Sequence, residues 1–314
     1  MNIFKFTAKF KNEQTCRKHL RVLREEKGIV CKNCGGVKHY WTESLDRWKC
    51  ANCSKCMNLR VGTIFEKSHI PLRTWFMCIH LMTTSKKPFS CSEMQRQLGL
   101  KRIEPVWYMM QKIRIAMGKR DGKYKLKGEI EMDDCFIEVV DLPEKDELGN
   151  IIKNEEIQKR GRGSQNQQTV LIMVESTPNP KQENKHKKKR VMGFVKMVTV
   201  DNLNSKGINF EVQKNIEQKS TIISDGFRAF AGLNKVVDKH SSEVIPSKEA
   251  HKKLPWVHTQ IANVKRQLLG THHSINRKYL QNYLNEFTYK LNRRNFQSDM
   301  FDRFIIAGAN DTWY

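Results

Sequence analysis

The chain has 314 residues, of which 39% are hydrophobic and 29% charged, and its formal net charge is +24. This length predicts two or three domains, and the apolar content is enough for a core in each. So large a positive charge predicts a polyanionic partner, nucleic acid before a membrane surface. No apolar run approaches the ~18 residues of a membrane-spanning helix. The charged start MNIFKFTAKFKNEQ lacks the apolar region of a signal peptide. We therefore expect an intracellular protein, cytoplasmic and associated with the nucleoid, or nuclear in a eukaryotic host.

The pattern of residue types divides the chain into four segments. We expect a helical lead over residues 1–27, a cysteine-rich module over 28–67, a helical region over 68–122 and a mixed α/β domain over 123–314. The last segment contains a polar, charge-rich insertion at 141–167. The predicted fold class is therefore multi-domain α+β. The apolar positions of the helical lead are Cys16, Leu20, Val22 and Leu23.

Two cysteine pairs predict a zinc ribbon. Cys31 and Cys34 are followed after fifteen residues by Cys50 and Cys53, which is the pattern C-x2-C-x15-C-x2-C. Each pair can bring two thiolates to one ion, and the two pairs complete a tetrahedron around Zn²⁺ with no open position, so the site is structural. Gly35-Gly36 supplies a tight turn, and Cys56 is an alternative to the last ligand. The remaining cysteines are expected to be small buried hydrophobes: Cys16, Cys56, Cys78, Cys91 and Cys135.

The polar residues around the cysteine pairs leave two interpretations open, contact with DNA phosphates or contact with another protein. The candidates for phosphate contact are Lys32, Lys38, His39, Arg47, Trp48 and Lys49.

The helical region predicts a helix-turn-helix. Ser90 or Ser92 is a suitable N-cap for the first helix, and Gly99 ends it. A second helix has apolar residues at a spacing of three and four, and it would be the recognition helix. On this interpretation the residues exposed toward DNA are Lys101, Arg102, Tyr108, Gln111, Lys112 and Arg114.

The α/β domain predicts strands and helices in a mixed order. Strands are expected over about 130–140, 169–174, 191–200 and 221–223, and helices over 205–215, 255–269 and 277–293. A basic run at 185–190 lies between the second and third strands, either as a solvated hairpin tip or as a DNA contact.

Carboxylates within this domain predict a divalent-metal site. Alternation along the first strand places Glu131 and Asp133 on one face and Asp134 on the other. Asp225 follows the strand at 221–223, at its C-terminal end. Acids inside strands are costly unless they bind something. Carboxylate oxygens suit Mg²⁺ or Mn²⁺, and two such ions can support an in-line attack on phosphate.

A late helix is expected to carry the third ligand. Pro255 suits its first position and Gly270 its C′ position. His258 and Lys265, seven residues apart, lie on nearly the same edge, whereas Asn263 points away. We expect the imidazole of His258 to face the metals and Lys265 to face DNA. The alternative is a helix-face histidine and a solvated lysine.

Several sequence blocks resemble the insertion-sequence DDE transposases that have an N-terminal zinc ribbon and an ISXO2-like catalytic domain. The resemblance covers nearly the whole chain. The blocks are GTIFEKSHIPLRTWF after the cysteine pairs, LKGEIEMDDCF, GRG at 161–163, IISDGFRAF and LPWVHTQIANVKRQLLGTHHSINRKYLQNYLNEFTYKLNRR.

The resemblance implies an RNase H-like catalytic domain and a metal-dependent endonuclease and strand transferase. It would act on the double-stranded terminal inverted repeats of its own element and on target DNA. Asp133 would be the first acid, Asp225 the second, and Lys265 the basic residue after the third, with Arg266 beside it as a further DNA contact. His258 stands where many relatives have glutamate; Asn263, Glu131 or Asp134 are alternatives for that ligand. Pairing two element ends implies a homodimer or a higher oligomer on DNA.

Two further hypotheses remain beside a transposase. One is a zinc-ribbon DNA-binding protein or regulator whose catalytic domain has decayed, because the third carboxylate is missing. The other is a nuclease that cuts without joining ends.

Overall fold

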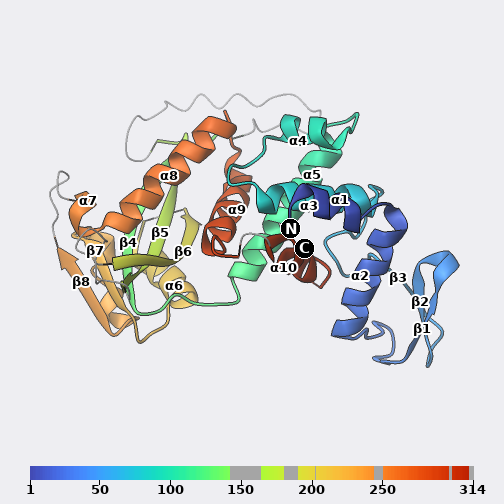
Figure 1. Cartoon of the computed structure of the whole chain (residues 1–314). Helices are drawn as coiled ribbons and strands as arrows, with labels where there is room; N and C mark the ends of the chain where they lie inside the picture. Colours follow the sequence, from blue (N-terminus) through green and yellow to red (C-terminus); the bar gives the residue numbers. More distant parts are fainter. Residues whose placement is uncertain (142–163, 180–189, 202, 244–249, 297–298, 311–314) are drawn as a thin grey trace, which may run out of the picture. The chain divides into compact units, whose positions relative to one another are not determined.

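The computed structural model describes residues 1–141, 164–179, 190–201, 203–243, 250–296 and 299–310. The chain forms two compact units, one made of Met1–Arg120 with Arg293–Tyr314 and the other of Asp121–Asn292 (Figure 1). Within the described ranges, no helix is both long and apolar enough to span a bilayer.

The first unit begins with two helices rather than one. Helix α1 covers Ile3–Lys9 and helix α2 covers Glu13–Lys27. The break occurs because the side chain of Asn12 accepts a hydrogen bond from the Thr15 N–H and caps α2. On the α2 face, Cys16 and Leu20 are buried as expected, but Val22 is 49% exposed.

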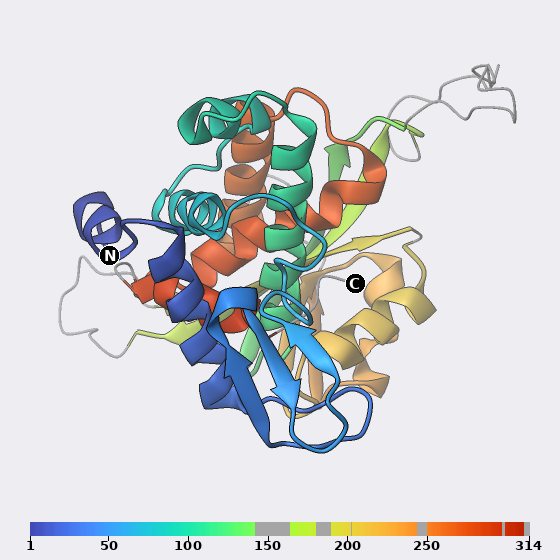
Figure 2. The ribbon, with the colours of Figure 1, turned by 90° about the vertical axis from the view of Figure 1, so that its right-hand side faces the viewer.

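The cysteine-rich module forms a small antiparallel sheet in the order β1-β2-β3, with bounds His39–Thr42, Arg47–Cys50 and Cys56–Asn58. Figure 2 shows this sheet next to α2. Trp48 of β2 is 1% exposed, and its Nε1–H donates to Glu25 of α2 at 3.0 Å. The guanidinium of Arg24 lies 5.0 Å from the centre of the same indole ring. Trp48 therefore anchors the sheet to α2, and its prediction as a phosphate contact is wrong.

Three further helices follow, α3 (Leu72–Thr84), α4 (Cys91–Leu98) and α5 (Glu104–Asp121). Ser90 is the N-cap of α4, accepting from the Glu93 N–H, and Gly99 ends the helix with φ +64°. The predicted helix, turn and helix are therefore present, and the N-cap is Ser90 rather than Ser92.

The C-terminal helix α10 (Met300–Gly308) belongs to the first unit. Its Phe301 ring lies 5.4 Å from Phe6 and 6.0 Å from Phe76, and Gly308 O accepts from the Ile64 N–H. The expectation that residues 293–314 are part of the catalytic domain is wrong, because the apolar face of α10 completes the aromatic core formed by α1 and α3.

The second unit contains a five-stranded sheet in the order β6-β5-β4-β7-β8. The strands are β4 (Glu129–Glu138), β5 (Gln167–Pro178), β6 (Arg190–Val200), β7 (Thr221–Asp225) and β8 (Lys239–Glu243). Strands β4, β5 and β6 are antiparallel neighbours, while β7 pairs parallel to both β4 and β8. The order and directions are those of an RNase H-like domain. Strand β8 was not expected from the sequence, because KHSSE carries no apolar pattern.

Helices cover both faces of this sheet (Figure 1). On one face, α8 (Pro255–Thr271) and α9 (Leu280–Asn292) pack with Cys135, Ile137 and their neighbours. On the other face, α6 (Ser205–Asn215) packs with Ile130 and Met132. The short helix α7 covers Ala250–Lys253. Short 3-10 turns occupy Glu43–Leu45, Arg228–Phe230, Leu233–Lys235 and Arg277–Tyr279.

Replacing Phe301 with alanine should destabilise the first unit and leave the second unit intact. A buried Phe→Ala substitution costs about 3–5 kcal/mol, and Phe301 contacts aromatic rings of α1 and α3 only within the first unit. Hydrogen exchange should show lost protection in α3 and unchanged protection in β4 and β5. Phe4, which is 80% exposed, provides the matched Phe→Ala control. Lost protection in β4 and β5 with none in α3 would contradict this assignment of α10.

Candidate active site and zinc centre

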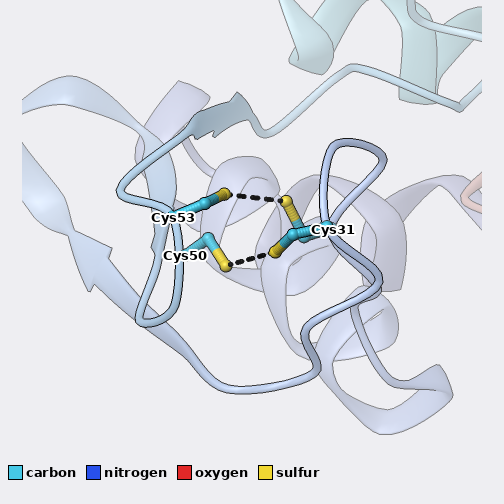
Figure 3. A group of neighbouring side chains, drawn as sticks. Cys31, Cys50 and Cys53 are labelled. Atoms are coloured by element: carbon cyan, nitrogen blue, oxygen red, sulfur yellow. Dashed lines mark hydrogen bonds between the residues drawn. The ribbon is translucent and has the colours of Figure 1, made fainter.

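The four predicted zinc ligands lie together (Figure 3). The Sγ atoms of Cys31 and Cys53 are 3.6 Å apart, as are those of Cys34 and Cys50, and all four sulfurs lie within 4.8 Å of one another. A tetrahedral Zn²⁺ with its usual Zn–S bonds requires S···S separations of roughly 3.8 Å, whereas a disulfide requires ~2.05 Å. The quartet fits zinc, and Cys53 rather than Cys56 is its fourth member.

Backbone conformation shapes both cysteine knuckles. Gly35, directly after Cys34, has φ +72°, and Ser54, directly after Cys53, has φ +58°. The tight turn in the second knuckle lets the Lys55 N–H donate to the Cys53 sulfur, which lowers the pKa of that thiol to about 6. The thiolate that a metal requires is thereby favoured.

The predicted recognition helix α5 does not expose the expected polar face. Gln111, Lys112 and Arg114 are only 4%, 8% and 2% exposed. The Lys112 ammonium donates to the Glu66 carbonyl at 2.8 Å. The prediction that these three side chains are exposed to DNA is wrong, because the helix is buried on most sides and their alkyl stems join the packing. Lys101 and Arg102, which precede α5, and Tyr108, in its second turn, are exposed as expected.

The two predicted acids occupy neighbouring strands at the centre of the sheet. Strands β4 and β7 are parallel with Met132 opposite Ser224, so one further step along each strand brings Asp133 beside Asp225. Alternation places both on the sheet face that α8 covers, because Cys135 and Ile223 of the same strands pack there. Asp134 lies on the opposite face.

The environment of Asp133 disfavours its ionised form. Burial raises its pKa to about 7; a hydrogen bond from the Asp134 N–H opposes this shift, and the charges of Asp225 and Asp134 add to it. Two carboxylates held together with little water are strongly stabilised by a divalent cation. The donor chemistry of the pair therefore fits Mg²⁺ or Mn²⁺.

The third candidate ligand comes from the first turns of α8. His258 Nδ1 lies 3.8 Å from Asp133 Oδ2, and the two side chains are 29% and 14% exposed. Lys265, two turns further on, is exposed at the surface, and its charge acts on the Cys135 thiol in β4. His258 and Lys265 therefore lie on the side of α8 that faces β4, as expected from their spacing. Helix α8 continues through Gly270 to Thr271, so Gly270 is not its C′ residue.

The remaining candidates lie as follows. Arg266 is exposed and Asn263 is half-buried. Glu131, considered as a replacement ligand, is 3% exposed, and its Oε2 accepts from the Trp256 and Val257 N–H groups at 2.8 and 3.0 Å. Burial raises its pKa despite these bonds. Its Oε2 therefore binds the backbone at the start of α8 rather than pointing toward the proposed metal site. The signal in the sequence was Pro255 preceded by Leu254, a helix start without a capping side chain of its own.

His258 approaches Asp133, but the three candidate ligands are not gathered as closely as the four cysteines are. Among the residues that the structure describes, only the cysteine quartet gathers three or more potential ligand atoms as closely as a bound ion requires. The ligand atoms of Asp133, Asp225 and His258 therefore do not all lie within 4.8 Å of one another, so side-chain rotation would have to bring them closer before they could bind one ion together.

Two sequence predictions concern residues outside those described. They are the GRG block at 161–163, with most of the insertion at 141–167, and residues 185–189 of the basic run. The last member of that run, Arg190, is described and forms an ion pair with Glu129 at 2.6 Å.

The pKa of Asp133 predicts a pH dependence of stability in the metal-free protein. Between pH ~4 and pH ~7 the folded state holds a proton that the unfolded state has released, so the free energy of unfolding falls as pH rises. Asp133→Asn removes this titration. It should stabilise the metal-free protein more at pH 8 than at pH 5, by at least about 1.4 kcal/mol, the equivalent of one pKa unit. Urea unfolding at the two pH values measures the difference, with exposed Asp238→Asn as control. Equal stabilisation at both values would refute the raised pKa.

Comparisons with known proteins assign the chain to a family. Residues 125–292, more than half of the chain, match the family model of the ISXO2-like transposase domain. An uncharacterized protein in transposable element ISH50 of Halobacterium salinarum is 21% identical over 286 residues, covering 88% of this chain and 90% of that protein.

Solved structures with some similarity include the Mos1 mariner paired end complex with Mn, at 8% identity and a TM-score of 0.29, covering 74% of this chain and 78% of that one. The Mos1 strand transfer complex gives 10% identity and a TM-score of 0.27, covering 75% and 78%. Scores this low carry no argument about fold or function, whereas the family match spans the whole five-stranded sheet with α8 and α9. The chain therefore belongs to the ISXO2-like transposase domain family.

Proposed function

We propose that this transposase binds the terminal inverted repeats of its own insertion element, cleaves the DNA there and joins the 3′-hydroxyl ends to target DNA. The observation that carries the proposal is the placement of Asp133 and Asp225 on neighbouring strands, on the sheet face that α8 covers, with His258 of α8 at 3.8 Å from Asp133. Membership of a transposase family supplies the reaction class.

Each residue of the proposed site would have its own role in the reaction. Asp133 and Asp225 would hold divalent ions through their carboxylate oxygens, and His258 would offer a neutral ring nitrogen. When bound, a pair of such ions activates a water or a 3′-hydroxyl and stabilises the leaving oxygen. Asp133 must lose its proton before it can act as a ligand. Lys265 and Arg266, exposed on the same helix, are suited to hold the DNA phosphates.

The replacement of a third carboxylate by His258 has an electrostatic consequence. The site carries one negative charge fewer than a site with three acids. Nitrogen ligands also bind Mn²⁺ relatively better than Mg²⁺. We therefore expect Mn²⁺ to support cleavage better than Mg²⁺.

The zinc ribbon contributes a basic face. The two acids between the cysteine pairs, Glu43 and Asp46, form ion pairs with Arg21 and Arg17 of α2. The opposite side of the sheet carries Tyr40 beside Lys49, and Tyr40 is 58% exposed. Glu43 and Asp46 thus pair with arginines of α2, whereas Lys49 on the other side of the sheet carries a positive charge, which favours DNA over a protein partner for this face.

The same module also contains a hollow beside the first cysteine pair. It has a volume of about 360 Å³ and is lined by Lys32, Asn33, His39, Lys55 and Asn58, among others. These side chains offer hydrogen-bond donors suited to phosphate oxygens and base edges.

Assembly and location follow from the same function. Two element ends must be held together for joining, so the active complex contains at least two protomers on DNA. Work on DNA requires the protein to reach the nucleoid.

A second candidate function is DNA binding without catalysis, as a regulator of the element. His258 in place of a third acid is the observation that favours it. The two candidates differ in one measurable outcome, because only the transposase cuts its repeats when a divalent ion is present.

Asp133→Ala should abolish cleavage of DNA that carries the inverted repeats and leave the affinity for that DNA within about twofold. The reason is that Asp133 faces the metals in the second unit, whereas the ribbon face lies in the first. Cleavage mapped at nucleotide resolution with Mn²⁺ or Mg²⁺ measures the first effect, and a binding titration measures the second. Asp238→Ala, at an exposed position, is the control. Continued cutting by Asp133→Ala would overturn the assignment of the first acid.

Lys49→Ala should weaken DNA binding and flatten its salt dependence. Each phosphate contact contributes roughly 0.9 to the slope of log K against log salt, so the slope should change by about that amount. Lys214→Ala, an exposed lysine on α6, matches the change in charge. Identical slopes for wild type and Lys49→Ala would exclude this face from DNA contact.

A further inference from the structure

Helix α8 begins without a capping side chain of its own. Its N-cap residue is Leu254, which makes no side-chain cap bond, and its first residue is Pro255, which has no N–H. The His258 N–H already bonds within the helix, to Leu254 O at 3.2 Å. The first turn therefore leaves two backbone donors to be satisfied, the N–H groups of Trp256 and Val257.

Glu131 satisfies both donors with one oxygen. Its Oε2 accepts from Trp256 at 2.8 Å and from Val257 at 3.0 Å, across a sequence separation of more than 120 residues. The side chain is 3% exposed. Its negative charge also lies at the positive end of the helix dipole, which strengthens both bonds.

These bonds lie next to two of the proposed metal ligands. Along β4, Asp133 is two residues from Glu131 on the same face; along α8, His258 directly follows Val257. The strand and the helix are thus fixed to each other at the point where Asp133 and His258 approach to 3.8 Å.

We propose that Glu131 is a positioning residue, which sets His258 at the correct distance from Asp133 by bonding the start of α8 to β4. This inference rests on the proposed function. Glu131 binds no metal in this role. A histidine on a helix has limited reach, so a small displacement of the helix start removes its nitrogen from an ion held by Asp133 and Asp225.

The test compares Mn²⁺ affinity, measured from the electron paramagnetic resonance signal of free Mn²⁺, across variants of the full chain. The variants are Glu131→Ala, Glu131→Gln, His258→Ala and the double variant Glu131→Ala/His258→Ala. Residues that orient a ligand typically change metal affinity by about 10–100-fold. We expect at least a tenfold loss in Glu131→Ala and near wild-type affinity in Glu131→Gln, whose amide oxygen can still accept. The double variant should be no weaker than the weaker single variant.

Glu138→Ala is the matched control, because it removes an exposed carboxylate from the same strand. Affinity losses that multiply in the double variant would overturn the proposal. So would a Glu131→Ala protein that melts at a lower temperature but binds Mn²⁺ normally, since that pattern shows stability alone.

Hydrogen exchange separates failure of this inference from failure of the proposed function. In metal-free protein the amides of Trp256 and Val257 should exchange faster in Glu131→Ala and remain protected in Glu131→Gln. Unchanged exchange in Glu131→Ala would refute the role of Glu131 whether or not the protein binds metal. Absence of Mn²⁺ binding by the wild type would instead contradict the proposed function.

Discussion

The constraint on which the catalytic unit depends is the placement of two carboxylates side by side where water is scarce. Parallel pairing of β4 and β7 brings Asp133 next to Asp225, and burial with mutual repulsion holds the pKa of Asp133 near 7. Such an arrangement is costly in the metal-free protein and becomes favourable when a divalent cation neutralises it. The rest of the unit holds the two carboxylates in place despite this unfavourable free energy. Apolar cores on both faces of the sheet hold the strands in register, and α8, which covers the acids, carries His258, the proposed nitrogen ligand.

The other unit solves a different problem, the stability of a small module with little core. The ribbon strands bury few apolar side chains. Trp48, held between the sheet and α2, contributes to the stability of the module, and the four cysteines fit a zinc ion that would add to it. The C-terminal helix α10 completes the aromatic core beneath α1 and α3. The chain therefore passes from this unit into the catalytic unit and back again.

Local chemistry made several features predictable from the sequence. Ligand spacing was enough for the cysteine quartet, alternation for the faces of Asp133 and Asp134, and capping chemistry for Ser90 and Gly99. Features that depend on distant partners were not predictable. Periodicity did not reveal that Gln111, Lys112 and Arg114 are buried, because burial depends on what surrounds α5.

The same limit explains the other differences. Strand β8 forms through backbone hydrogen bonds to β7, and its polar sequence contains no pattern that predicts this pairing. Helix α10 belongs to the first unit because Phe301 contacts Phe6, a residue nearly 300 positions away in sequence. Glu131 was expected as an alternative metal ligand because the N–H groups that it binds, at the start of α8, are remote in sequence. The residues Leu254-Pro255 did indicate a helix start without a capping side chain. The roles proposed for Asp133, Asp225, His258 and Lys265 rest on the positions of these residues in β4, β7 and α8.

The most direct measurement is anomalous diffraction at the manganese edge from crystals grown with Mn²⁺. The account predicts a peak between Asp133 and Asp225 at bonding distance from a carboxylate oxygen of each, with a nitrogen of His258 completing the protein ligands of one ion. A crystal of a protein that cleaves its repeats with Mn²⁺, but whose peak lies away from these residues, would contradict it.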